Sequence, residues 1–411
     1  MHRKSAGQGR SRGAQRGQAL ILVMLVLLVV AVLGTAAVTL ATSHRQTAAR
    51  QRNLVQAYYA ADAGVERVLV MIRQNPGWFM PEPLKNVPYA GGNIERVTVE
   101  KLQGGPGTGL KITSEGTFIK ARKTLEVKVR VYTPGDLLKG VSIFPPAPDY
   151  LQEITGNFTL KGESGKPRPV FLIDGSLDVR GATQKHIDAD VYASGSIEGL
   201  TGDNVHPRYL AVPPFPELKE EWYRTQAKYL YSDDITFPLE SQKRDHGKER
   251  KRDVPSSDHG KGEGQQGKSE DVAEYSGVYF VDGNVRISGA YSGQAVIVAG
   301  GNIEVTGDLR AEDRGNDLLV LISLNPGGGV DIKNYSVDAL IIASGIFSAQ
   351  GNAQLFGGII ASQLDLNGSV TITCDPALTE SNQDLLGLAF GDSNNRPVIR
   401  IESWSEQYPV F

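Results

Sequence analysis

An uninterrupted apolar run, ALILVMLVLLVVAVLGTAAVTLA, occupies the chain from Ala19 to Ala41. About 23 uncharged residues are enough to cross a bilayer as one helix. A cleavable secretory signal has a shorter apolar region, so the run predicts a retained membrane anchor. The alternative is a buried core helix of a soluble protein, but such helices rarely lack a polar face over this length.

The polar sequence that follows keeps one apolar stripe. Its members recur at alternating steps of four and three residues: Leu54, Tyr58, Ala61, Val65, Val68 and Ile72. This spacing places them on one face of a helix, where we expect them to form packing contacts. We therefore predict one helical segment over residues 18–75, running from about Gln18 to Gln74 and stopped by Pro76. At 1.5 Å per residue, such a helix is on the order of 85 Å long.

Strand patterns begin after an irregular linker that contains several prolines. Between residues 88 and 133, apolar and charged residues alternate, most strictly at Leu125, Val127, Val129 and Val131. The alternation predicts a small antiparallel β meander of three strands with one apolar face. We expect the amphipathic half of the helix to cover that face.

From residue 141 to residue 375, short apolar runs end repeatedly in glycine-bearing turns. The units are VFLIDGSLDVRG from Val170, DVYASGSIEGLTG from Asp190, GVYFVDGNVRISG from Gly277, AVIVAGGNIEVTG from Ala295, ALIIASGIFSAQG from Ala339 and GIIASQLDLNG from Gly358. Neighbouring units lie about twenty residues apart, in the range of stacking repeats. A single unit cannot bury its apolar face, so we predict a right-handed parallel β-helix, or solenoid. An antiparallel sandwich is the rival, although its strands usually resemble one another less.

Two insertions interrupt the predicted solenoid. Residues 213–231 follow a proline cluster and predict a helix whose candidate packing residues are Leu218, Trp222 and Tyr229. Residues 240–272 contain almost no apolar side chain and predict a disordered loop. Its basic centre, residues 243–252, is interleaved with acidic residues, which favours a solvated linker over a site for anionic polymers or lipid headgroups.

The last segment, residues 376–411, predicts a cap or a tail. Val398, Ile399 and Ile401 have the pattern of a final strand, which we expect to close the open end of the solenoid. Three aromatic residues are then capping contacts or a sticky tail for a partner: Trp404, Tyr408 and Phe411.

The composition agrees with a membrane helix followed by β structure. The chain has 411 residues, 40% of them hydrophobic, and its 47 glycines indicate a turn-rich, mainly β protein. The net charge of -3 gives no reason to expect nucleic acid as a partner. The single cysteine, Cys374, cannot form an internal disulfide and is expected to be buried in a strand.

A short basic leader, residues 1–17, precedes the apolar run. Its basic residues are Arg3, Lys4, Arg10, Arg12 and Arg16. By the positive-inside rule they place the N terminus in the cytoplasm and the bulk of the chain outside, in a single-pass arrangement. Four basic residues behind the run weaken this asymmetry: His44, Arg45, Arg50 and Arg52.

The segment RGQALILVMLVLLVV, which contains Gly17, and the later segment QAYYAADAGVERVL resemble the N-terminal region of PilX-type minor pilins. The resemblance covers about residues 10–75 and points to the type IV pilus assembly family. It implies that a prepilin peptidase cuts between Gly17 and Gln18. It also implies that the helix lies in membrane lipid or packs with other pilins and pilus assembly proteins. Two positions depart from the pattern: Leu22 stands where major pilins carry glutamate, and Gln18 stands where Phe or Met is usual.

Few residues indicate chemistry. The histidines are scattered, and none stands at metal-ligand spacing from another ligand. Asp174 and Asp282, each followed by glycine, would suit a glycosidase pair or a calcium site if they lay on adjacent rungs, but a tight turn favours the same pairs. Three more residues are candidates for an acidic patch: Asp188, Asp190 and Asp338. We predict no catalytic residue, no cofactor and no metal site.

The expected function is therefore a non-enzymatic, membrane-anchored component of a type IV pilus or a related secretion pseudopilus. Its solenoid head would contact other subunits or adhere to a surface, and the chain would reside in the cytoplasmic membrane or in a pilus at the cell surface. The alternative is a membrane-tethered β-helix enzyme or binding module for surface polysaccharide. A third hypothesis is a scaffold that polymerises by end-to-end stacking of solenoids.

Overall fold

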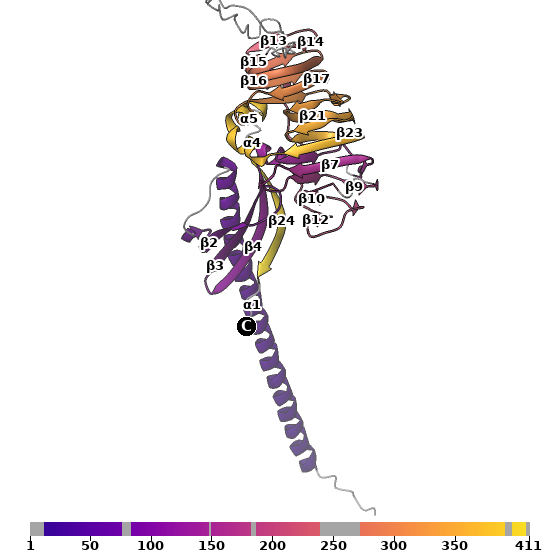
Figure 1. Ribbon diagram of the computed structural model, residues 1–411. Helices are drawn as coiled ribbons and strands as arrows, with labels where there is room; N and C mark the ends of the chain where they lie inside the picture. Colours follow the sequence, from indigo (N-terminus) through magenta and orange to yellow (C-terminus); the bar gives the residue numbers. More distant parts are fainter. Residues whose placement is uncertain are drawn as a thin grey trace, which may run out of the picture.

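The computed structural model describes residues 12–75, 84–147, 149–181, 186–238, 272–390 and 397–407, with side chains from residue 20 onward. A long N-terminal apolar helix leads to a small antiparallel sheet and a large all-parallel sheet, and the chain is mainly β (Figure 1). The first part of the leader, the loop of residues 240–271 and the aromatic residues Tyr408 and Phe411 lie outside the described residues. The expectations for them stay predictions.

Helix α1 runs unbroken from Arg12 to Gln74, a length on the order of 95 Å. It begins earlier than the expected Gln18 and ends where the sequence predicts. The next proline, Pro76, explains this end, because proline disfavours helical conformation in the residue before it and offers no N–H. From Leu20 to Arg52 every residue is exposed, and only the C-terminal part of α1 packs against the rest of the chain (Figure 1).

The small sheet has five strands in the order β1-β2-β3-β4-β24. Their bounds are β1 (Leu84–Tyr89), β2 (Gly92–Leu102), β3 (Thr108–Phe118), β4 (Ala121–Tyr132) and β24 (Val398–Gln407). All neighbours in this sheet are antiparallel. The predicted three-strand meander corresponds to β2, β3 and β4, and β1 and β24 extend it at its two edges.

The expectation that the C-terminal segment caps the solenoid is wrong for its last strand. β24 pairs with β4, from Val398 opposite Tyr132 to Gln407 opposite Thr124. Its short apolar pattern suits the edge of an existing sheet as well as the end of a solenoid, and sequence spacing alone does not distinguish these two places.

The remaining strands form the solenoid. Before the helical insertion these are β5 (Gly140–Ile143), β6 (Leu151–Ile154), β7 (Asn157–Gly162), β8 (Val170–Ile173), β9 (Ser176–Val179), β10 (Asp190–Ala193), β11 (Ile197–Glu198) and β12 (Val205–His206). After it come β13 (Tyr229–Tyr231), β14 (Ile235–Phe237), β15 (Ala273–Val281), β16 (Val285–Ala299), β17 (Ile303–Ala311), β18 (Leu318–Ser323), β19 (Gly329–Lys333), β20 (Ser336–Asp338), β21 (Leu340–Gly351), β22 (Gln354–Phe356) and β23 (Ile359–Cys374). These strands pair only in parallel, so the antiparallel sandwich is excluded.

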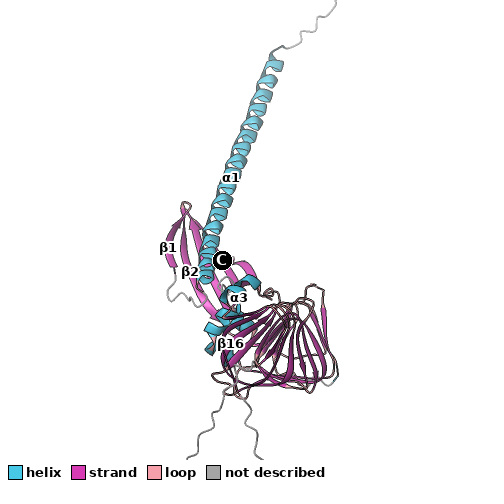
Figure 2. Ribbon diagram, turned by 90° about the horizontal axis from the view of Figure 1, so that it is seen from above, coloured by secondary structure: helices cyan, strands magenta, loops and turns pink. Residues whose placement is uncertain are grey.

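Successive rungs superimpose when the solenoid is viewed from above (Figure 2). On one face Val296 pairs with Val278 on one side and with Val320 on the other. A second face joins β14, β16, β17, β19, β21 and β23, and a third joins β17, β20, β22, β23 and β7. Stacking of this kind gives each apolar rung the neighbour that it needs to bury its inner side.

The rungs do not stack in sequence order. The chain enters the solenoid at β5 in its middle and winds to one end at β12. It then crosses to the other end at β13 and winds back until β23 lies beside β5, with Ile360 opposite Ser142. Entry and exit are therefore neighbours, and the whole solenoid is inserted between β4 and β24 of the small sheet.

The strands on the first face are apolar on both sides because both sides are covered. Phe171 and Ile341 belong to the interior core of the solenoid, whereas the neighbouring Leu172 and Ile342 belong to an outer cluster. Three short helices contribute to that outer cluster: α2 (Pro134–Leu137), α3 (Glu220–Gln226) and α5 (Gln383–Phe390). Helix α4 (Pro376–Ser381) packs beside α2 and α5. Double coverage explains the continuous apolar runs in the repeats.

Helix α3 is shorter than the insertion predicted over residues 213–231. Leu218 and Trp222 are half-buried in the outer cluster, while Tyr229 lies on β13 and stacks on Tyr279 with ring centroids 4.6 Å apart. The buried Tyr223, which the sequence did not single out, donates a hydrogen bond to the Ala389 carbonyl at 2.5 Å. The insertion thus fastens α5 to the solenoid.

Candidate assembly site

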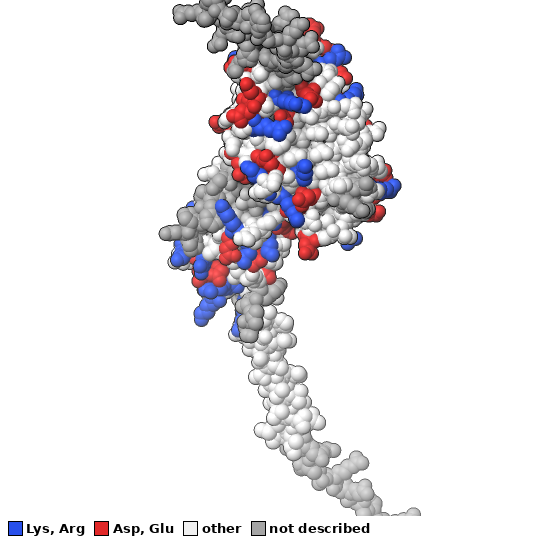
Figure 3. Space-filling view, viewed as in Figure 1, with Lys and Arg blue, Asp and Glu red and all other residues white. Residues whose placement is uncertain are grey.

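The exposed half of α1 is the most apolar surface among the residues that the structure describes. The helix is long and apolar enough to cross a membrane by length and composition, with a window of mean hydropathy 3.0 that is not buried. The space-filling view shows no charged side chain on the stretch of the helix that projects away from the head, whereas the head carries mixed charges (Figure 3). Three arginines follow this stretch before the packed half begins: Arg45, Arg50 and Arg52. An apolar surface of this kind needs lipid or other apolar helices around it.

The predicted cleavage position lies within α1. Gly17 and Gln18 are helical, and their side chains lie outside the part of the chain whose side chains are described. Leu22, the position at which major pilins carry glutamate, is exposed on the same helix. Cleavage between Gly17 and Gln18 stays a prediction.

The amphipathic half of α1 packs on β2, β3 and β4. Of the predicted stripe, the C-terminal members Ala61, Val65, Val68 and Ile72 are buried against the sheet, and Tyr58 is half-buried. Leu54, at 38% exposure, lies beyond the packed region. Helical periodicity identifies a face but does not indicate where along the helix the sheet ends.

Two glycines bring α1 into close contact with β3. A Cβ atom on Gly116 would collide with the carbonyl oxygen of Ala57 and the amide nitrogen of Ala61, both in the backbone of α1. A Cβ atom on Gly64 would collide with the hydroxyl of Ser114, which is buried on β3. These contacts do not follow from the sequence, because a glycine in a strand, such as Gly116, indicates a close backbone approach without naming the partner.

A polar junction joins the small sheet to the solenoid on the face of β4 opposite α1. The Arg130 Nε donates a hydrogen bond to Glu402 Oε1 at 2.7 Å, across β4 and β24. The hydroxyl of Tyr209, in the solenoid, donates to the same oxygen at 2.9 Å. Burial raises the pKa of Tyr209 well above its ordinary value, so the phenol stays protonated and remains a donor.

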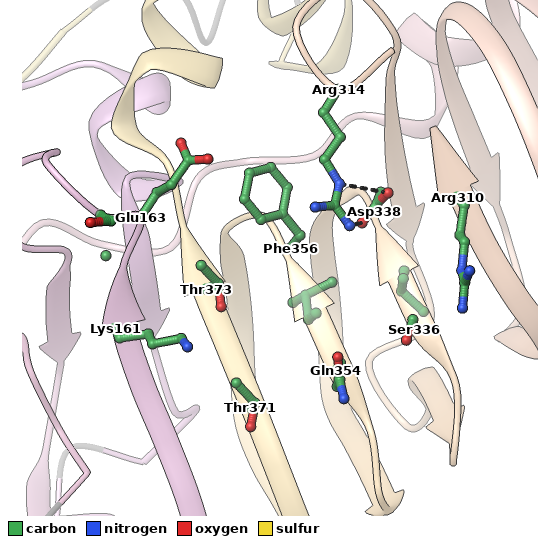
Figure 4. Close-up of a pocket in the computed structure, with 14 residues that line it drawn as sticks. Lys161, Glu163, Arg310, Arg314, Ser336, Asp338, Gln354, Phe356, Thr371 and Thr373 are labelled. Atoms are coloured by element: carbon green, nitrogen blue, oxygen red, sulfur yellow. Dashed lines mark hydrogen bonds and ion pairs between the residues drawn. The ribbon is translucent and has the colours of Figure 1, made fainter. Parts of the chain in front are cut away.

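A groove of about 620 Å³ crosses the third face of the solenoid (Figure 4). Side chains from adjacent strands line it in register: Ser336 pairs with Gln354, Gln354 pairs with Thr371, and Thr373 pairs with Lys161. These residues present hydroxyl, amide and ammonium groups at the interstrand spacing of about 4.8 Å. The groove offers hydrogen-bonding groups. Of the two carboxylates that line it, Glu163 and Asp338, the second is bound to Arg314.

One end of the groove is fixed by an ion pair. Arg314 binds the buried carboxylate of Asp338 with two hydrogen bonds, Nε to Oδ2 at 3.0 Å and Nη2 to Oδ1 at 2.9 Å, and lies 4.6 Å over the Phe356 ring (Figure 4). The hydrogen bond to Asp338 raises the pKa of Arg314 above its ordinary value. With both oxygens engaged, Asp338 is held as a structural carboxylate.

The other acidic candidates are not brought together. Asp174 follows β8, where its carboxylate accepts a hydrogen bond from Ser194, whereas Asp282 follows β15 near the opposite end of the solenoid and pairs with Arg224. The hypothesis that these two aspartates form a pair on adjacent rungs is therefore wrong. Asp188 pairs with Arg168, and no group of three potential metal ligands occurs within the described ranges.

Cys374 lies at the end of β23 and is buried, free of any disulfide. Burial raises the pKa of its thiol to about 12. A neutral, inaccessible thiol is neither a nucleophile nor a ready partner for an intermolecular disulfide.

Comparison with known proteins identifies the N-terminal region. Residues 16–66 match the protein family described as PilX N-terminal, which spans the exposed half of α1 and the start of its packed half. No curated protein sequence matches the chain. The crystal structure of the competence-associated pilin ComZ from Thermus thermophilus aligns with a TM-score of 0.37 and 15% sequence identity, over 87% of this chain and 98% of that chain. The resemblance to PilX-type pilins over this region is thus confirmed.

Proposed function

We propose that this chain, a type IV pilin-like protein with a PilX N-terminal domain, is a minor subunit of a type IV pilus or of a related secretion pseudopilus. The observation that carries the proposal is the division of α1. One continuous helix exposes an apolar half and uses its other half to hold the head, through Ala61 and Val68 among others. An anchor without a further role has no need of so long a rigid connection to its domain.

The mechanism that we infer is transfer of α1 between two apolar surroundings. Before assembly the exposed half lies in membrane lipid, with the N terminus in the cytoplasm and the head outside. On assembly the same surface packs among the helices of other pilins, so hydrocarbon does not become exposed to water. The head is carried as a rigid body, because Gly64 and Gly116 place α1 directly on the sheet.

The proposed role requires no catalysis. The described head holds no assembled pair of catalytic carboxylates, and the carboxylate in the groove, Asp338, is engaged by Arg314. We infer a non-enzymatic subunit whose partners are other pilins, pilus assembly proteins and, for processing of the leader, a prepilin peptidase.

The test is mass spectrometry of the full chain, produced in cells that assemble pili. We expect the protein in sheared pili to begin at Gln18, and we expect Gly17→Asp to leave the leader intact and remove the protein from the pili. The matched control is Gly327→Asp, the same substitution in an exposed turn of the solenoid, where the nearest atom to an added Cβ is 3.6 Å away. An intact leader together with absence from sheared pili would contradict the proposal.

The groove favours a second candidate function, a binding surface for a cell-surface polysaccharide. Gln354, Thr371 and Thr373 offer hydrogen bonds in register along the solenoid, and Lys161 adds a positive charge. Binding of purified surface polysaccharide to the detergent-solubilised chain should fall at least tenfold in the double variant Gln354→Ala and Thr371→Ala. Equal binding by the variant would exclude the groove.

A further inference from the structure

The free edges of the sheets differ sharply from one another. An edge strand presents unpaired backbone N–H and C=O groups, and proteins guard such edges with short strands, prolines or charged side chains. In the small sheet the edges are β1 and β24. The solenoid has its own edges at its two ends.

The other edge of the small sheet, β1, and four terminal strands of the solenoid are short. β1 has only six residues, contains Pro88 and has Asn86 in a left-handed conformation with φ of 52°. At the ends of the solenoid, β11 and β12 have two residues each, and β13 and β14 have three each. Strands this short offer little backbone to a partner.

β24 has one such guard, the basic residue Arg400, and is longer than the other edge strands described above. It has ten residues, VIRIESWSEQ, with neither proline nor glycine, and β4 is the one strand that pairs with it among those described. Its two acidic residues do not protect the edge, because Glu402 binds Arg130 and Glu406 binds Lys123, both across the sheet. A register shift between Ile401 and Ser403 adds twist, but the pairing with β4 resumes beyond it.

The apolar face of the small sheet also continues onto β24 beyond α1. Ile401 lies opposite Val129, and Trp404 lies opposite Val127, and both valines are fully buried. Ile401 and Trp404 are themselves 46% and 37% exposed, because α1 lies over β2, β3 and β4. β24 thus combines exposed apolar side chains with unpaired backbone N–H and C=O groups. Such a surface can bind an added strand.

We propose that the edge of β24 receives an extended strand of a different protein, which adds antiparallel to the small sheet. On this face β24 presents Ile401 and Trp404, which carry no charge, so the matching strand is uncharged on its inner face. Its apolar side chains alternate and cover Ile401 and Trp404 beside α1.

A second copy of this chain does not satisfy the geometry. Antiparallel pairing of two β24 strands places a twofold axis between them, which reverses one protomer relative to the other. β24 runs beside α1, as the yellow strand in Figure 1 shows, so the two α1 helices would point in opposite directions. Their apolar halves then could not share one membrane or one fibre. The inference that the partner is a different protein rests on the proposed function. The observation that the β24 edge is open does not rest on it.

The experiment places a photoreactive amino acid at Ser403, which is exposed on β24, in the full chain in cells that assemble pili. We expect adducts to one extended segment of one other protein, mapped by mass spectrometry. Ile401→Lys should lower the adduct yield at least tenfold. The matched control Ile119→Lys, at a position 76% exposed in the turn between β3 and β4, should leave the yield unchanged.

The mapped segment is then tested as a synthetic peptide against the detergent-solubilised full chain by hydrogen exchange. We expect slower exchange across residues 398–407 and no change in β1. Adducts only to a second copy, adducts that Ile401→Lys does not reduce, no adduct, or peptide binding without protection of β24 would each overturn the proposal. If the adducts formed in membranes and the chain never entered pili, the proposed strand pairing would stand. The proposed role in a pilus would then be wrong.

Discussion

Arg130 on β4 and Glu402 on β24 form an ion pair across the two strands between which the whole solenoid is inserted, with Nε and Oε1 2.7 Å apart. Arg130 is only 8% exposed, and the same Glu402 oxygen accepts the hydroxyl of Tyr209 from the solenoid. The Glu402 carboxylate on β24 therefore contacts both β4, which precedes the solenoid, and the solenoid itself. This contact helps to hold the solenoid on the small sheet.

Glu402→Ala should destabilise the head. Removal of the carboxylate leaves the buried guanidinium of Arg130 without its counter-ion and Tyr209 without its acceptor, at a cost of about 2–4 kcal/mol in the free energy of unfolding. Chemical denaturation of the full chain in detergent, followed by tryptophan fluorescence, measures the change. Trp404 on β24 and Trp222 on α3 report on the two sides of the junction.

The control for this variant is Glu304→Ala, which breaks an exposed pair with Arg286 and Lys333 on the solenoid. Exposed pairs of this type contribute about 0–1 kcal/mol. If the two variants lost equal stability, Glu402 would have no special place in the junction.

Gly116→Ala should loosen α1 from the small sheet. The added Cβ atom meets the α1 backbone at Ala57 and Ala61, which are not flexible side-chain ends, so the helix has to shift. We expect a loss of about 1–3 kcal/mol and faster hydrogen exchange in the packed half of α1. In contrast, Gly34→Ala meets no atom within 4 Å in the subunit and should leave its stability unchanged or slightly higher. Unchanged exchange in the Gly116 variant would disprove the close approach.

We expect the folded chain to lose stability in alkaline solution because the thiol of Cys374 is buried. Burial raises its pKa to about 12 from an ordinary value near 9, so the folded chain keeps a proton that the unfolded chain releases. The stabilising contribution is full below about pH 9 and is lost as the pH rises towards 12, at up to about 1.4 kcal/mol per pH unit. Unfolding measured at pH 8 and pH 10.5 should therefore show a smaller pH dependence in Cys374→Ala than in the unaltered chain. Identical slopes would mean that the thiol is not protected.

Labelling provides an independent measurement at the same residue. A maleimide at pH 8 should modify Cys374 only at the rate at which the chain unfolds. Rapid labelling of the native chain would contradict its burial.

The local elements could be predicted from the sequence. The apolar run and the stripe that follows it give α1 and its end at Gln74, and the alternation from Leu125 to Val131 gives β4. The glycine-terminated repeats give the parallel solenoid. In each case the signal is a periodicity within one short segment, and such periods reflect which face of an element is buried.

The arrangement of these elements could not be predicted. The contact of β23 with β5 joins residues far apart in sequence, and no local pattern selects that rung over another. β24 reads equally well as a cap or as an edge strand, because Ile399 and Ile401 only require an apolar neighbour. The Arg130–Glu402 pair depends on the pairing of β24 with β4, so it could not be predicted from the sequence either.

The most direct test of the central claim follows the exposed half of α1 during assembly. A photoreactive amino acid at Leu28, which is exposed in the subunit, is introduced into the full chain in cells that form pili. If α1 exchanges lipid for other helices, irradiation should give adducts to the helix of another pilin in sheared pili and adducts to lipid in the membrane fraction. Lipid adducts alone, with no pilin adduct in any fibre fraction, would show that α1 is only a membrane anchor.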